Sequence, residues 1–224
     1  MKTNAKLAIA ALATLLCAAA LAAPQGKIYG YYKDGVYTAP GKLFTVSSPF
    51  PDEANVTDGR EPENNNAGAV SFIDSAGHLL GVLYMENKTN LFGSEDPKAP
   101  DYLSSWFRDT GFPGFFKVSI PDAEILREEK GQIAGLPAWI AVAYLPKASP
   151  LGRQIKDTYE FVRNDSYRGI AVVAHGKHYY LLQTELRIDA LAGKGWTYNE
   201  TAADWNAFVP ELEAFYERIE FLKP

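Results

Sequence analysis

The sequence predicts an α+β fold in which a mostly antiparallel sheet is sandwiched between helices (α/β/α). The strongest sign is a hairpin, because residues 169–175 and 178–185 are joined by the two-residue turn Gly176-Lys177, as in a type II′ turn. The register of such a hairpin makes both of its faces apolar, so it belongs in the middle of a sheet that is covered on each side. One face would carry Ala171, Val173, Tyr180 and Leu182, and the other Ile170, Val172, Ala174, Tyr179 and Leu181.

The first 22 residues are typical of a signal peptide. Lys2 and Lys6 form a positive region, residues 7–21 form an uncharged and predominantly apolar region, and Ala20-Leu21-Ala22 has the small-x-small pattern of a cleavage site. We therefore expect a mature chain that begins at Ala23 and is periplasmic or secreted in a bacterium.

Two alternatives to cleavage after Ala22 are less favoured. Lipidation of Cys17 would anchor the chain to a membrane, but lipoprotein processing normally requires a small residue just before the cysteine, and Leu16 occupies that position. An uncleaved anchor is disfavoured because the apolar run falls short of the ~20 residues that span a bilayer. We expect no transmembrane segment in the mature chain.

The mature chain, residues 23–224, is expected to form a single domain. Cleavage would remove Cys17, the one cysteine of the chain, so packing must provide the stability without a disulfide. The leader also takes Lys2 and Lys6 from the 22 basic residues, which leaves a net charge of −7 against 27 acidic residues. Without a basic cluster, nucleic acid is not an expected partner.

The first half of the mature chain predicts two hairpins and one strand. Residues 28–32 and 36–38 flank a turn with Gly35, residues 43–46 form a strand, and residues 69–73 and 79–85 flank a turn closed by Gly77. The polar residues 52–67 predict a loop, which either contacts a partner or is merely tolerated. We favour the second.

The middle of the chain predicts a short helix, a hairpin and an ambiguous segment. Helical spacing places Tyr102, Leu103, Trp106 and Phe107 on one face of residues 101–109, with Gly111 after them. A strand at residues 123–129 would precede a hairpin made of residues 132–134 and 138–145, with its turn at Gly135-Leu136-Pro137. Residues 148–164 fit a helix, and partly a strand, and we favour the helix.

The C-terminal segment predicts an amphipathic helix preceded by a capping box at Thr201 and Asp204. Pro210 interrupts it, so either the helix kinks there or the main helix runs over residues 209–220. We expect Trp205, Leu212, Phe215 and Ile219 to face the sheet.

Several stretches together resemble the PsbP-like superfamily. They are residues 35–37 through 44–46, the small-residue turn at 133–138, the apolar hairpin at 169–185, and the closing helix with Phe221. The resemblance implies an antiparallel sheet between helices and a protein that binds or assembles. It carries no catalytic motif onto any residue of this chain, and a fold alone does not assign a task.

The sharpest chemical hypothesis concerns His175 and His178, which would face each other across the hairpin tip. Cross-strand Cβ atoms lie about 5 Å apart, so two imidazoles could reach one metal ion. Because no third ligand can be named, we favour a pair of solvated residues and assign neither a metal nor a cofactor.

No catalytic residue can be assigned from the sequence. There is no Gly-x-Ser-x-Gly motif, and His78 follows a turn glycine, as a surface residue at the start of a strand would. Paired acidic residues such as Glu128 and Glu129 lie in charged stretches. A periplasmic hydrolase with an unrecognised site is the alternative function.

Tyrosines are crowded near the mature N-terminus. Alternation sends Tyr29 and Tyr31 to one side of a strand and Tyr32 to the other, so one set could bind a sugar or a peptide. We favour the simpler view that they cover a sheet edge. We therefore expect an exported, non-catalytic binding or assembly factor, with an envelope protein or a small ligand as its partner.

Overall fold

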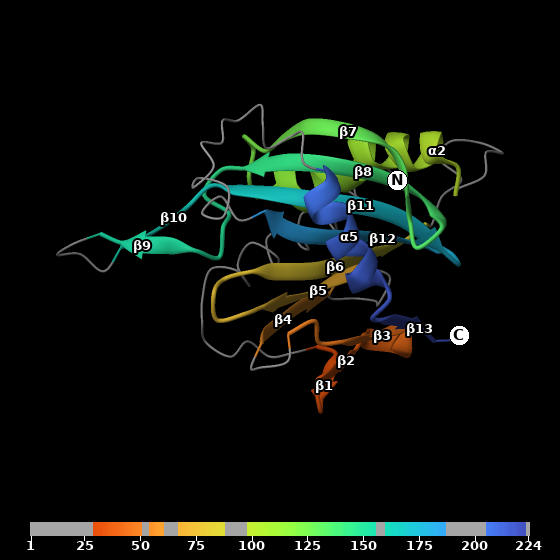
Figure 1. The fold of residues 1–224 in the computed structure, drawn as a ribbon, viewed down its shortest axis with the longest axis horizontal. Coiled ribbons are helices and arrows are strands. Elements are labelled where there is room, and N and C mark those ends of the chain that lie inside the picture. Colours follow the sequence, from red (N-terminus) through yellow and green to blue (C-terminus); the bar gives the residue numbers. More distant parts are fainter. Residues whose placement is uncertain are drawn as a thin grey trace, which may run out of the picture.

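The computed structural model describes residues 29–50, 54–60, 67–87, 98–155, 160–186 and 205–222. Its centre is a seven-stranded antiparallel sheet, and a four-stranded and a two-stranded sheet accompany it (Figure 1). In spatial order the large sheet comprises β4 (Asn55–Arg60), β5 (Ala67–Ile73), β6 (Leu79–Glu86), β12 (His178–Leu186), β11 (Ser166–His175), β8 (Leu136–Leu145) and β7 (Glu124–Ile133). The four-stranded sheet comprises β1 (Tyr31–Lys33), β2 (Val36–Thr38), β3 (Phe44–Ser47) and β13 (Ile219–Phe221).

The hairpin β11–β12 occupies the centre of the large sheet, as the sequence predicts. Val173 pairs with Tyr180 and Val172 with Leu181, so the predicted register is confirmed. Gly176 has φ 57° while Lys177 does not have a positive φ, which agrees with a type II′ turn. Both apolar faces are buried in separate clusters.

One face of the large sheet is covered by a helical segment. It begins as α2 (Pro100–Trp106) and continues in wider π-helical turns, η2 (Phe107–Gly111) and η3 (Pro113–Lys117). The four residues predicted to face the sheet are buried there. The expected end near Gly111 is wrong, because the missing side chain of Gly111 lets the chain continue against the Trp106 ring, 2.8 Å from where a Cβ would lie.

The opposite face is covered jointly by α5 (Trp205–Tyr216) and by the four-stranded sheet, with 3-10 turn η1 (Pro40–Lys42) between β2 and β3. The fold is thus α+β and sheet-dominated, and the expected sandwich between helices is only partly right. Pro210 lies inside α5, which continues through it. The helix ends at Tyr216, and Ile219–Phe221 then form β13, which pairs with β3. The predicted extent of the helix to residue 220 is therefore wrong.

The predicted packing is confirmed for Leu212 and Phe215 of this helix, and Ile219 is buried in the same cluster although it lies on β13. The capping box at Thr201 and Asp204 and the side chain of Trp205 lie outside the described residues.

Two-residue turns close two further hairpins. The turn of β1–β2 is Asp34-Gly35, with φ 50° and 76°, and that of β7–β8 is Ala134-Gly135, with φ 49° and 78°. The second turn has two residues where three were predicted, so β8 begins at Leu136 and contains Pro137. The two predicted strand segments before the turn form one strand, β7. β11 pairs with β8 only from Trp139 to Leu145, so no hydrogen bond from residue 137 to β11 is needed and a proline is tolerated there.

Two segments predicted as a loop and a helix contain strands. Asn55–Arg60 forms β4 at the sheet edge, where its backbone pairs with β5 and the partly buried Val56 packs on the core. The rest of residues 52–67 is described only in part. Within 148–164, β9 (Gly152–Gln154) pairs with β10 (Phe161–Arg163), so the expected helix is wrong. Within the described part of the chain, no helix is long and apolar enough to cross a membrane.

Candidate functional site

One end of the central hairpin is polar although it is buried. Arg168 on β11 and Glu185 on β12 are directly opposite in the register and only 5% and 6% exposed. Alternation along the strands places them on the same face as Ile170 and Leu181. This pair was not predicted from the sequence, although the change from apolar to charged residues at the open end of the hairpin is a signal for it.

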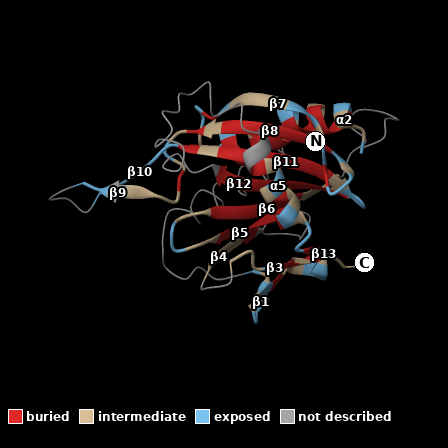
Figure 2. Cartoon of the chain, viewed as in Figure 1, coloured by how far each residue is buried: buried red, intermediate tan, exposed pale blue. Residues whose placement is uncertain are grey.

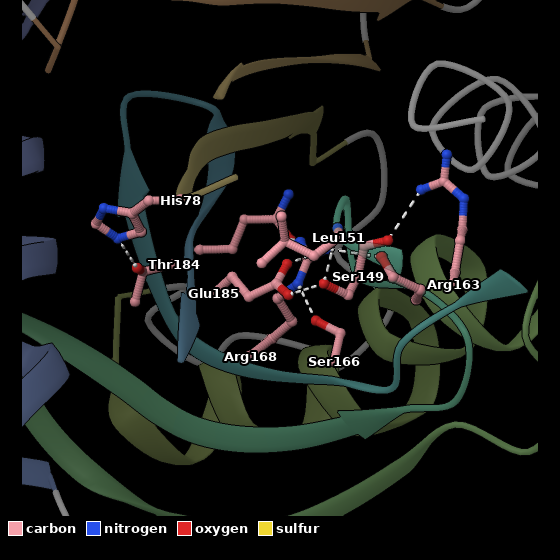
Figure 3. A network of polar contacts seen from close by, with 10 residues as sticks. His78, Ser149, Leu151, Arg163, Ser166, Arg168, Thr184 and Glu185 are labelled. Carbon is pink, nitrogen blue, oxygen red and sulfur yellow. Dashed lines mark hydrogen bonds and ion pairs between the residues drawn. The ribbon is translucent and has the colours of Figure 1, made fainter. Parts of the chain in front are cut away.

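The Arg168 guanidinium is held by four groups around it (Figure 3). Its Nη2 lies 3.5 Å from Glu185 Oε2 and donates to the Ala148 carbonyl at 3.3 Å. Its Nε donates to Ser166 Oγ at 2.7 Å, and Nη1 donates to Gln183 Oε1 at 3.0 Å. The cation therefore has a partner on each side, as a buried charge requires.

Ser149 connects this pair to the two-stranded sheet. Its hydroxyl donates to Glu185 Oε1 and accepts from the Leu151 amide at 3.1 Å. Its carbonyl accepts from Arg163 Nη1 at 3.0 Å, and its amide donates to the Asn164 carbonyl at 3.1 Å. One buried serine thus contacts both sides of the base from which β9 and β10 extend.

The electrostatics of the pair are set by burial. Desolvation raises the pKa of the Glu185 carboxyl above its usual range, and Arg168 and the Ser149 hydroxyl oppose this shift. A serine beside a carboxylate is a pair that a hydrolase could use. Here Ser149 is 2% exposed and its oxygen is already engaged by Leu151, so the observed arrangement holds a loop in place.

A second group of polar side chains lies on the opposite face of β12, around Thr184. His78 Nε2 is 2.8 Å from Glu211 Oε1 of α5, and the Thr184 hydroxyl donates to Glu211 Oε2 at 2.6 Å. His78 directly precedes β6, as expected, and its side chain is 21% exposed, so it is half-buried and not a free surface residue. Its contact with Glu211 joins the β5–β6 turn to the helix. Thr184 is fully buried, which keeps its hydroxyl from acting as a nucleophile on a substrate.

His175 and His178 are paired across the hairpin tip, as the register predicted. They are not both solvated: the His175 ring stacks on Phe221 at 3.8 Å, and His178 is buried beside Tyr84 and Tyr180. The His175 ring is covered because β13 brings Phe221 to this end of the sheet, which the sequence pattern did not predict. Burial lowers the pKa of both imidazoles. In the residues covered by the structure, no three His, Cys, Asp or Glu side chains form a group able to hold a metal.

The tyrosines alternate as predicted. Tyr29 and Tyr31 are exposed, Tyr31 at 61%, whereas Tyr32 packs against the core. The Asp58 carboxylate on β4 accepts from the Tyr29 amide and from the Tyr37 hydroxyl, both at 2.9 Å, and so ties the small sheet to the large one. These contacts explain how the segment is held and assign no ligand to it.

The β9–β10 ribbon, which we call the arm, projects from the body of the molecule (Figure 1). Phe161, Val162 and Ile155 are exposed on it, Phe161 at 54%. Figure 2 shows exposed segments, in pale blue, on the arm. Phe161 pairs with Gln154 and its ring lies over Gly152, whereas Val162 pairs with Arg153 and therefore points to the other face. Apolar side chains thus reach solvent from both faces of the arm.

Comparisons with known proteins give a resemblance in structure alone. No family model matches the chain, and no curated protein matches it. The structure resembles cyanobacterial PsbP. The solution structure of that protein, CyanoP from Synechocystis sp. PCC 6803, is 10% identical, with a TM-score of 0.45 over 88% of this chain and 98% of the other. A crystal structure from Bacteroides thetaiotaomicron VPI-5482 is 9% identical, with a TM-score of 0.39 over 86% of this chain and 50% of the other. Identities this low say nothing about function.

Proposed function

We propose that this protein is an exported, non-catalytic binding or assembly factor of the cell envelope, and that its arm contacts a partner protein. The leader pattern at residues 1–22 supports export. The exposed apolar side chains of the arm carry the proposal of binding. The hydroxyls of Ser149 and Thr184 support it too, since both residues are buried and both hydroxyls donate to carboxylates.

The arm exposes apolar side chains on a two-stranded ribbon that no other described strand covers. A two-stranded ribbon is marginally stable in water unless a third strand, a helix or another surface covers it. Phe161 and Val162 lie on opposite faces of the arm, and both are exposed. Burial of such side chains against another protein would remove apolar surface from water at about 25 cal/mol per Å².

Site-specific photo-crosslinking tests this proposal. A photoreactive phenylalanine analogue replaces Phe161 in the full-length protein, in the cells that export it. Val118 is the control position, because it is also apolar and 45% exposed but lies directly after η3 and is not part of the arm. We expect a discrete adduct with one protein from position 161 and none from position 118.

A paired variant provides the independent check. Phe161→Ser with Val162→Ser should abolish co-purification of the cross-linked protein while the melting temperature stays within a few degrees, because both side chains are exposed. Equal adducts from both positions, or unchanged co-purification, would refute binding by the arm.

A hydrolase is the alternative, and the contact between Ser149 and Glu185 is the observation that favours it. A fluorophosphonate probe that labels activated serines distinguishes the two functions. We expect no labelling of Ser149, since its hydroxyl is buried. Stoichiometric labelling that Ser149→Ala removes would favour the hydrolase.

A further inference from the structure

The attachment of the arm to the body is narrow. β9 and β10 pair with each other and with no other described strand. The ladder begins where the Asn164 amide donates to the Leu151 carbonyl at 2.9 Å, and it continues to the Ile155 amide, which donates to the Glu160 carbonyl at 2.9 Å. Beneath this ladder lies Ser149. The position of the arm therefore depends on how Ser149 is held.

We propose that the hydrogen bond from Ser149 to Glu185 is a latch that fixes the arm, and that the arm moves as a hinged unit when this bond is lost. The proposal concerns the position of the arm alone, so it holds whether or not the arm binds a partner.

The side of the latch that belongs to the body is rigid. Glu185 is on a central strand, and its carboxylate faces Arg168, which Ser166 and Gln183 hold from either side. Each of these residues is at most 6% exposed. The buried pair thus presents Glu185 Oε1 at a fixed point beneath the base of the arm.

On the arm side, other contacts at the base would still hold the chain if the Ser149 hydroxyl were lost. Loss of the Ser149 hydroxyl would remove the bond to Glu185 and the acceptor of the Leu151 amide together. The contacts that use other atoms would persist. They are the Ser149 amide to the Asn164 carbonyl, the Ser149 carbonyl to Arg163, the Ala148 carbonyl to Arg168, the Asp165 carboxylate to Lys147 and Tyr144, and the Leu151 side chain on the β5–β6 turn beside Gly77. These contacts allow a rotation at the base while the rest of the fold stays closed.

Amide hydrogen exchange of Ser149→Ala tests the latch. Loss of a hydrogen bond is worth about tenfold in an opening equilibrium, so exchange at Ile155 and Asn164 should be about tenfold faster than in the parent. The Leu181 amide, on the central strand β12, should be unchanged. Ser119→Ala is the matched control, because the buried Ser119 hydroxyl has no hydrogen-bond partner among the described residues. It should alter neither set of amides.

Two outcomes would overturn the latch. Exchange at Ile155 and Asn164 that is unchanged in Ser149→Ala would show that the bond does not hold the arm. A parallel rise at Leu181 would show that Ser149 supports the whole fold instead.

The parent protein gives a test without substitution. Its arm amides should exchange through an opening that is independent of low denaturant concentrations, whereas Leu181 should exchange through the global, denaturant-dependent unfolding. A single shared denaturant dependence would exclude a hinged arm.

Discussion

At the scale of the residue, the buried pair of Arg168 and Glu185 is the feature that most needs a physical account. Transfer of an ion from water to the protein interior costs several kcal/mol, and a pair offsets this only if its remaining hydrogen-bonding groups are satisfied. Arg168 meets that condition through Ser166, Gln183 and Ala148. Glu185 meets it only in part, because its Oε1 accepts from Ser149 while its buried Oε2 has the 3.5 Å contact with Arg168 but no hydrogen bond. The pair thus gives little net stability, and it fixes the position of Ser149.

Removal of one partner should cost more than removal of both. Arg168→Met and Glu185→Leu should each lower the free energy of unfolding by about 3–5 kcal/mol, because each leaves a buried charge without its counterpart. The double variant should lose less than either single variant. Urea denaturation of the four proteins measures this, and additive losses would mean that the two charges do not depend on each other.

His178 should make stability depend on pH. Burial lowers the pKa of its ring in the folded protein, so the unfolded chain takes up the proton first as pH falls. The stability that this group contributes is present above its ordinary value of 6.5 and is lost as pH falls towards the folded value.

The measurement is the urea midpoint at pH 7, 6 and 5. The decline should be shallower in His178→Gln than in the parent, since all other titrating groups are common to both proteins. Identical slopes would contradict the burial of the imidazole.

At the scale of the element, α5 shows how a proline is accommodated in a helix. Pro210 is the sixth residue of α5 and lies on its exposed side, while Phe208, Leu212 and Phe215 are buried against the sheet. A proline inside a helix costs about 3 kcal/mol or more. Burial of the aromatic face is of similar size or larger, so packing keeps the helix continuous.

The packing of α5 predicts a large effect from a single truncation. Phe215→Ala should lower the free energy of unfolding by about 3–5 kcal/mol, because the ring is 1% exposed and lies 6.2 Å from Phe72. Phe161→Ala is the matched control on the exposed arm and should cost well under about 1 kcal/mol. Similar denaturation midpoints for the two variants would contradict the assignment of the core.

At the scale of the whole molecule, two apolar faces of one sheet require two covers. The α2–η3 segment covers one face, and α5 with the four-stranded sheet covers the other. Packing on both faces stabilises a mature chain that is expected to contain no cysteine. The arm lies outside this arrangement.

Processing of the leader can be tested on the exported protein. Its intact mass should match a chain that begins at Ala23 and carries no lipid, because Leu16 does not suit lipoprotein processing. Detection of a diacylated N-terminal Cys17 would contradict this prediction.

Local residue patterns were enough to predict the hairpins and the faces of the central strands. Gly176, Gly35 and Gly77 mark turns through local backbone geometry, and the strand period of two then assigns each side chain to a face. The same local rules placed Tyr102, Trp106 and Phe107 on one helical face. Such features depend on neighbours in the chain, so a pattern of residues is enough to predict them.

The remaining features depend on contacts between segments that are distant in the sequence. Asn55–Arg60 carries few apolar residues and Phe161–Arg163 is only three residues long, and both become strands because a neighbouring backbone offers hydrogen bonds. Arg168 and Glu185 are buried because the loop with Ser149 closes over them, and His178 is buried because distant Tyr84 lies beside it. Pairing and burial are set by partners far away in the sequence, and a local pattern contains no record of them.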